Sequence, residues 1–128
     1  MNTRYIMAAN AIFLGCIGVL LIFMPEETVG YLAWNEADII LLQILGALYF
    51  GFAITNWTAK ASLIGGIYGK PIAIGNFAHF MIATFALIRF LINDNFQIII
   101  LVLAIIYSSF TILFGYILFI YDPVTKQE

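Results

Sequence analysis

Four long apolar stretches divide this chain of 128 residues and constrain its fold more than any other feature. They cover residues 4–24, 38–57, 71–92 and 96–121, and an extension of the second to Ile64 is left open. Each has roughly the 20 residues that an α-helix needs to cross about 30 Å of hydrocarbon. A transmembrane barrel fits less well, because it needs about eight segments of alternating polarity. The sequence therefore predicts an all-α fold, a polytopic membrane protein whose residues 1–128 form a single four-helix transmembrane bundle.

Charged side chains are too few to cover a soluble protein of this size. Only 9% of the residues are charged and 64% are hydrophobic, whereas soluble domains are about a quarter charged and about half apolar. The excess apolar surface must face membrane lipids, which are the first expected partners. A net charge of −2 argues against nucleic acid as a partner. The one cysteine, Cys16, cannot form a disulfide within the chain, and we expect neither a metal nor a cofactor.

Helix-breaking and capping residues separate the four stretches. Pro25 stops the first stretch, which is long for a signal-peptide core and is expected to be a retained helix. Asp38 suits the start of the second because the helix dipole favours an acid there, and Pro71 suits the first turn of the third. Residues 93–95 form a polar turn before the fourth stretch. Apolar side chains in the loop 25–37, with Trp34 among them, predict a short segment in the outer membrane interface.

The distribution of basic residues predicts the orientation in the membrane. With four alternating spans, one side carries Arg4, Lys60, Lys70 and Lys126. The other side carries acidic residues, with Arg89 near it. Since loops that stay in the cytoplasm are enriched in Lys and Arg, both termini are expected in the cytoplasm. The expected location is a bacterial inner membrane, crossed several times. Lys60 and Lys70 are then placed to touch acidic lipids.

Polar residues at membrane depth are the first candidates for function, because they are costly there. Asn10, Asn56, Asn76 and His79 all fall in the cytoplasmic half of the bilayer. Asn76 and His79 are three residues apart and share a helix face. Asn56 shares a stripe with Tyr49 and with the small residues Gly46 and Ala53, which permits close helix approach. We expect Asn56, Asn76 and His79 to meet inside the bundle, with Tyr49 and Asn10 completing a ligand-binding or polar-core set.

Two interpretations of this set stay open. In one, the set lines a binding pocket or handles protons through His79. In the other, which we favour, it is a hydrogen-bonded network that fixes helix register. His79 has no second histidine, cysteine or carboxylate nearby in the sequence for metal or nucleophilic chemistry, so we do not expect an enzyme.

A second polar set lies in the outer half of the membrane: Gln43, Arg89 and Asp38. Arg89 is expected to snorkel outward or to pair with an acid, and the alternative is a contact with an anion or a lipid headgroup. The hydroxyl residues of the fourth stretch, such as Ser108, Ser109 and Thr111, are expected to bond to their own helix backbone.

The run from Gln43 through Gly46 to Tyr49, which follows an acidic loop, resembles a pattern in small four-helix bacterial membrane proteins. It is similar to the DoxX-like group and to related membrane domains of unknown function. The resemblance covers the first half of the chain. It implies a four-helix fold, and it implies no activity, cofactor or functional residue.

These features favour a non-catalytic role for a small integral membrane protein. The expected function is that of an accessory subunit, or of a binder of a lipid or a small apolar ligand. The alternative is a small-molecule or ion transporter that acts as an oligomer, since four short helices rarely enclose a polar path alone. The expected protein partners are other membrane proteins or further copies of this chain.

Overall fold

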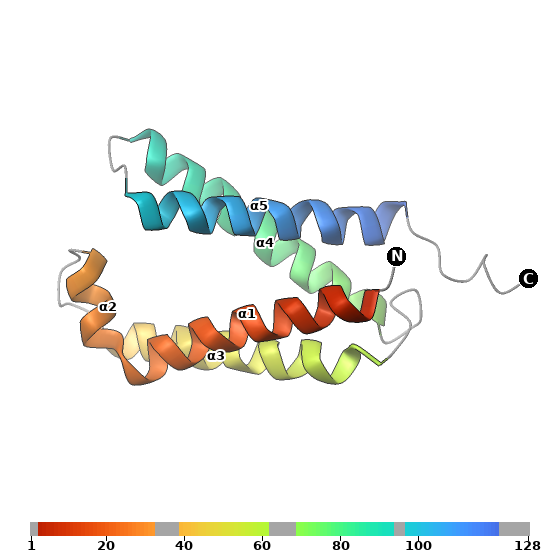
Figure 1. Ribbon diagram of the computed structural model, residues 1–128, viewed down its shortest axis with the longest axis horizontal. Helices are drawn as coiled ribbons and strands as arrows, with labels where there is room; N and C mark the ends of the chain where they lie inside the picture. Colours follow the sequence, from red (N-terminus) through yellow and green to blue (C-terminus); the bar gives the residue numbers. More distant parts are fainter. Residues whose placement is uncertain (1–2, 33–38, 62–68, 94–96, 121–128) are drawn as a thin grey trace, which may run out of the picture. The chain divides into compact units, whose positions relative to one another are not determined.

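The computed structural model describes residues 3–32, 39–61, 69–93 and 97–120. Every regular element in these ranges is an α-helix (Figure 1). The helices are α1 (Thr3–Phe23), α2 (Pro25–Leu32), α3 (Ile39–Ala59), α4 (Gly69–Ile92) and α5 (Ile98–Phe119). Of these, α1, α3, α4 and α5 are long and apolar enough to cross a membrane. The predicted fold class is confirmed: the chain is all-α and is a multi-pass membrane protein.

The helix boundaries lie close to the predicted ones, with one correction. Each of the four long helices begins and ends within two residues of its apolar stretch. The proposed extension of the second to Ile64 is wrong, because α3 ends at Ala59 and a turn follows at Lys60 and Ala61. The amide of Lys60 still donates to the carbonyl of Asn56 at 3.0 Å and closes the last helical turn. The last carbonyls of a helix have no amide partner within it, so an end beside a charged residue suits the membrane surface, where water can bond to them.

Pro25 ends one helix and begins the next. Proline has no amide hydrogen, so α1 ends at Phe23, and its fixed φ suits the first turn of α2. The hydroxyl of Thr28 donates to the carbonyl of Met24 at 2.8 Å and closes the junction. Pro25 and Val29 are buried, and the acidic residues of the first turn are exposed. A short helix therefore occupies part of the loop where the sequence predicted a short segment, while Trp34 lies outside the described residues.

The chain divides into two compact units, Met1–Ala61 and Ser62–Glu128. The first holds α1, α2 and α3 and is called the N-terminal hairpin. The second holds α4 and α5 and is called the C-terminal hairpin. Within each, the two long helices lie side by side (Figure 1). The prediction that residues 1–128 form one domain stays a prediction.

The N-terminal hairpin is held by backbone contact between α1 and α3. A Cβ atom built on Gly18 would lie 2.8 Å from the amide nitrogen of Phe50, and one built on Gly46 would lie 2.9 Å from the Cβ of Leu21. Only glycine permits this approach, which gives many dispersion contacts between helices that lipid surrounds. The buried residues of α1 recur every three or four positions and form one seam. They are Met7, Asn10, Ala11, Leu14, Gly18 and Leu21.

The C-terminal hairpin is held instead by aromatic rings. The ring of Phe80 in α4 is fully buried and stacks on Phe110 of α5, with 4.8 Å between ring centroids. The ring of Phe114 stacks at 6.1 Å, and Tyr107 meets Phe80 edge-on at 5.1 Å. Offset-stacked and edge-to-face pairs at these distances add to the stabilisation that area burial gives. The ring of Phe77 lies 3.1 Å from the position of a Cβ on Gly115, so this glycine makes room for it.

Candidate functional site

The register of the N-terminal hairpin places Asn10 opposite Asn56. Along this antiparallel pair, Gln43 contacts Ile22, and a Cβ on Gly15 would lie 3.5 Å from the Cβ of Ala53. Following the same register toward the start of α1 brings Asn10 to the level of Asn56. Both asparagines are completely buried, with 0% of each residue exposed. Two polar residues therefore lie within an otherwise apolar and small-residue seam, near the start of α1 and the end of α3.

Two of the buried asparagines, Asn56 and Asn76, bond to their own helices. The side-chain amide of Asn56 donates to the carbonyl of Phe52 at 2.8 Å, and that of Asn76 donates to the carbonyl of Ile72 at 2.9 Å. Each bond reaches back four residues along one helix. In hydrocarbon an unsatisfied polar group costs several kcal/mol, so a donor that bonds locally removes much of that penalty. This arrangement fits a structural role for both asparagines.

The predicted stripe on α3 is buried at its small and polar positions. Gly46, Ala53 and Asn56 are buried, and Tyr49 is half-buried between them. The close approach expected of the small residues is present at Gly46, where α1 and α3 meet. The stripe is therefore the face that α3 turns toward α1.

His79 lies among aromatic rings of the C-terminal hairpin. It is half-buried on α4, and its ring meets Phe80 edge-on at 5.0 Å between centroids. The ring of Tyr107 from α5 lies 5.7 Å away and is tilted by 49°. Within the described ranges, no three His, Cys, Asp or Glu side chains gather closely enough to hold a metal ion. The rings of Phe80 and Tyr107 are thus the neighbours that the structure gives His79 within its own hairpin.

A hydroxyl pair joins the two helices of the C-terminal hairpin. The Oγ1 atoms of Thr84 and Thr111 lie 3.3 Å apart. Thr111 donates its own hydroxyl proton to the carbonyl of Tyr107 at 2.9 Å, so Thr84 is the donor between the two threonines. The expected bonding of the α5 hydroxyls is confirmed, since Ser108 and Ser109 also donate to carbonyls four residues earlier.

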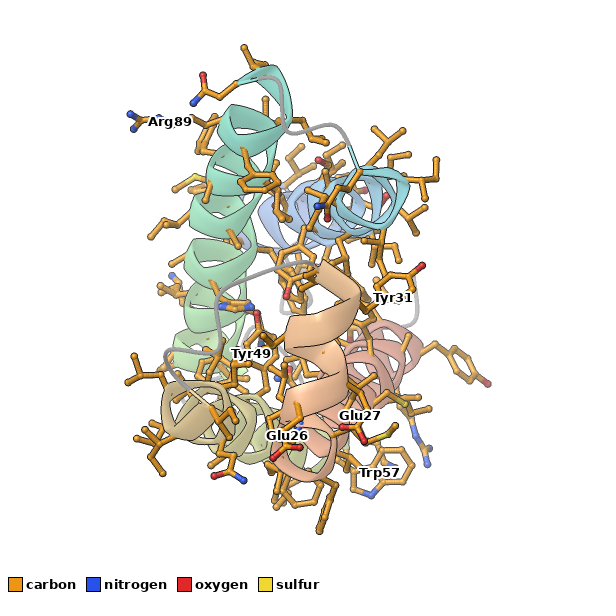
Figure 2. All side chains as sticks on the ribbon, turned by 90° about the vertical axis from the view of Figure 1, so that its left-hand side faces the viewer. Glu26, Glu27, Tyr31, Tyr49, Trp57 and Arg89 are labelled. Carbon is orange, nitrogen blue, oxygen red and sulfur yellow. The ribbon has the colours of Figure 1, made fainter. Side chains whose placement is uncertain are left out.

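Of the outer polar set, Gln43 makes a contact within the N-terminal hairpin, and Arg89 is an exposed charge. The side-chain amide of Gln43 donates to the carbonyl of Ile22 at 3.4 Å, in the last turn of α1, where carbonyls lack helical amide partners. Arg89 is exposed and extends away from α4 (Figure 2). Asp38 and Asp94 lie outside the described residues. Pairing of Arg89 with either acid therefore stays a prediction.

A contact at the end of the N-terminal hairpin was not predicted: the sequence placed Lys60 near acidic lipids and did not pair it with Trp57. The ammonium nitrogen of Lys60 lies 2.8 Å from the centroid of the Trp57 ring. Partial burial lowers the pKa of Lys60 below its usual range, and the positive charge of Arg4 on α1 lowers that pKa further. The signal was present as a tryptophan three residues before a lysine at the end of an apolar helix, a spacing that brings side chains together.

Asn56 belongs to the N-terminal hairpin, whereas Asn76 and His79 belong to the C-terminal one. Their meeting inside one bundle stays a prediction. No protein-family model matches the chain, and no curated protein or solved structure matches it. The similarity to the DoxX-like group therefore also stays an expectation.

Proposed function

We propose that this protein is a non-catalytic membrane component, an accessory subunit or a binder of a lipid or small apolar ligand, that works through the outer faces of its helices. The observation that carries the proposal is that polar side chains in the spans bond to their own helix. Asn56, Asn76, Thr58 and Ser108 each donate to the carbonyl four residues earlier, at distances from 2.6 to 2.9 Å. Each of these side chains therefore already uses one hydrogen-bond donor within its own helix, which leaves it fewer groups to offer a polar substrate.

The outward faces offer apolar contact instead. Large hydrophobic side chains are exposed along all four long helices, among them Ile12, Leu48, Phe85 and Ile105. Acyl chains, or the apolar face of another membrane protein, match this surface because both supply dispersion contacts without requiring hydrogen bonds. The role of an accessory subunit and that of a lipid binder both use such a face.

Purification from native membranes into lipid nanodiscs, followed by native mass spectrometry, tests the proposal. We expect the chain to retain a stoichiometric lipid, a small apolar ligand or a partner protein. A homo-oligomer that conducts ions or a small polar solute in reconstituted vesicles would contradict the proposal and favour the transporter alternative. Turnover of a substrate by the purified chain would contradict it in favour of an enzyme.

We also propose that both termini lie in the cytoplasm and that the membrane is a bacterial inner membrane. The antiparallel register supports this, because Arg4 at the start of α1 and Lys60 after α3 fall at the same end of their hairpin. In a Cys16→Ser background, Glu27→Cys should react with a membrane-impermeant maleimide in intact cells, while Ala61→Cys should be protected. Both positions are exposed, so a difference reports the side of the membrane. Labelling of Ala61→Cys alone would reverse the orientation.

A further inference from the structure

The basic end of the N-terminal hairpin combines charges from two helices. Arg4 lies in the first turn of α1 (Thr3–Phe23), and Lys60 follows the last residue of α3 (Ile39–Ala59). Because the two helices are antiparallel and locked by the Gly18–Gly46 contact, their register brings both cations to one level. In keeping with this register, the positive charge of Arg4 lowers the pKa of Lys60, in addition to the larger effect of burial. Two like charges held together by the fold favour an anion that contacts both.

Trp57 holds the ammonium group of Lys60 at this end of the hairpin. The Lys60 ammonium lies over the Trp57 ring, and about half of the Trp57 surface, 51%, remains exposed. Tryptophan concentrates at the headgroup level of membranes, so its ring sets the depth at which the ammonium lies. The contact also restricts the long lysine side chain before any ligand binds, which reduces the entropy lost on binding.

Apolar side chains beside the two cations distinguish a lipid from a free anion. Tyr5, next to Arg4, is 72% exposed, and Ile54, one turn before Trp57, is 55% exposed. A soluble phosphate uses only the charges, whereas a phospholipid places its phosphate at the cations and its acyl chains along these apolar surfaces. The arginine fork and the lysine ammonium together offer donors to both unesterified oxygens of a phosphodiester.

We propose that the basic end of the N-terminal hairpin binds the phosphate of an anionic phospholipid between Arg4 and Lys60, with Trp57 beneath the headgroup. This inference deepens the proposed lipid binding and rests on it. The phosphate is the charged part of the ligand, and a lipid held in this way contacts both α1 and α3. The attraction of each basic residue to anionic lipid corresponds to about a fivefold gain in affinity, so the two together give about thirtyfold.

Quenching of tryptophan fluorescence tests the inference. The chain has two tryptophans, so Trp34→Phe leaves Trp57 as the only reporter. The full-length variant is reconstituted in phosphatidylcholine vesicles that contain a small fraction of spin-labelled lipid. The label is placed near the head of one acyl chain, on either phosphatidylglycerol or phosphatidylcholine. We expect the labelled phosphatidylglycerol to quench Trp57 at a several-fold lower mole fraction than the labelled phosphatidylcholine.

Charge variants identify the residues responsible. Lys60→Gln and Arg4→Gln should each lower the selectivity for phosphatidylglycerol about fivefold, and Lys60→Arg should keep most of it. Lys70→Gln is the control for general surface charge: Lys70 is an exposed lysine at the start of α4 that is also expected near acidic lipids, and its removal changes the net charge equally, so we expect it to lower the selectivity less than Lys60→Gln does. Circular dichroism and the thermal midpoint of each variant identify any that fails to fold. If Lys60→Gln does not fold, the selectivity of Lys60→Arg is compared with that of Arg4→Gln and Lys70→Gln instead.

Three results would overturn the inference. The first is equal quenching by the two labelled lipids. The second is a loss of selectivity for phosphatidylglycerol in Lys70→Gln as large as the loss in Lys60→Gln. The third is removal of that selectivity by millimolar inorganic phosphate. The second result would indicate general surface charge, and the third would indicate a site for a free anion. If selectivity is absent while a lipid or partner still co-purifies with the chain, this inference fails and the proposed function stands. If selectivity is present and nothing co-purifies, the lipid site stands, and the proposed roles as an accessory subunit and as a binder of another small ligand fail.

Discussion

Gly18 and Gly46 bring the backbones of α1 and α3 into contact, since a Cβ atom at either position would lie 2.9 Å from the carbonyl oxygen of the other. The contact is symmetrical and involves backbone atoms, which cannot rotate away as a side chain can. A methyl group at either glycine must therefore push the two helices apart along the seam.

The first prediction follows from this contact. Gly46→Ala should lower the free energy of unfolding by about 1–3 kcal/mol, the usual cost of overpacking a closely packed interface. The added carbon would also lie 2.9 Å from the Cβ of Leu21 and from Cγ1 of Ile22. Thermal unfolding in detergent, followed by circular dichroism, gives the measurement.

Gly51 provides the matched control on the same helix. Nothing lies within 4 Å of a Cβ built there, so Gly51→Ala should be neutral or should stabilise the helix by up to about 1 kcal/mol. Equal losses of stability from the two variants would show that α3 tolerates no methyl group anywhere, and the specific contact with Gly18 would then be unsupported.

The second prediction concerns Asn10 and Asn56, which share a level in the N-terminal hairpin and are both fully buried. We expect Asn10→Leu and Asn56→Leu to be non-additive, with a coupling of at least about 0.5 kcal/mol in a double-mutant cycle. Asn10→Leu with Gln43→Leu is the control, because Gln43 contacts the opposite end of α1, at Ile22. Additivity of the Asn10 and Asn56 variants would contradict the register derived from the glycine contacts.

The third prediction concerns the hydroxyl pair of the C-terminal hairpin. Thr84→Val removes the donor to Thr111 and should cost about 0.6 kcal/mol, and at most about 1.7 kcal/mol, as measured for hydrogen bonds between membrane helices. Thr84→Ser should retain most of the stability because it keeps the hydroxyl. The control is Thr55→Val, since Thr55 is exposed and bonds only along α3, to the carbonyl of Gly51 at 2.9 Å. A Thr84→Ser variant as unstable as Thr84→Val would assign the effect to packing.

The fourth prediction concerns Arg89, whose side chain is exposed and extends away from α4. We expect Arg89→Lys to change the thermal midpoint very little, because a lysine reaches water or headgroups from the same position. A fall of several degrees that added lipid or ligand restores would show a forked contact that lysine cannot reproduce. The outer half of the membrane would then hold a binding site.

The spans themselves were predictable because length and hydropathy leave few alternatives. A stretch of about 20 apolar residues must satisfy its backbone groups internally, and a helix is the structure that does so in lipid. Pro25 was predicted only in part: it ends α1 as expected, and it also starts α2. Proline suits both the end of one helix and the first turn of another, so a proline alone does not predict whether a loop or a new helix follows it.

Packing within the spans was harder to predict, because lipid chains are as apolar as the residues that face them. The stripe of Gly46, Ala53 and Asn56 was found because small and polar residues mark a helix interface. The aromatic packing of Phe80 on Phe110 and Phe114 gave no such signal, since phenylalanine is equally suited to a lipid-facing surface. The contact between Lys60 and Trp57 could have been predicted from their spacing of three residues. The proximity of Arg4 could not, because it depends on the antiparallel register of α1 and α3.

The division into two hairpins has a consequence for how the protein is made. The partner of each long helix is the next long helix along the chain, so α1 meets α3 and α4 meets α5. Residues 1–61 therefore contain both sides of the glycine contact and the buried Asn10 and Asn56, and can complete that packing while residues 62–128 are still being synthesised. Errors during membrane insertion should consequently follow the hairpin in which a substitution lies, and a defect at Gly18 should leave insertion of α4 and α5 intact.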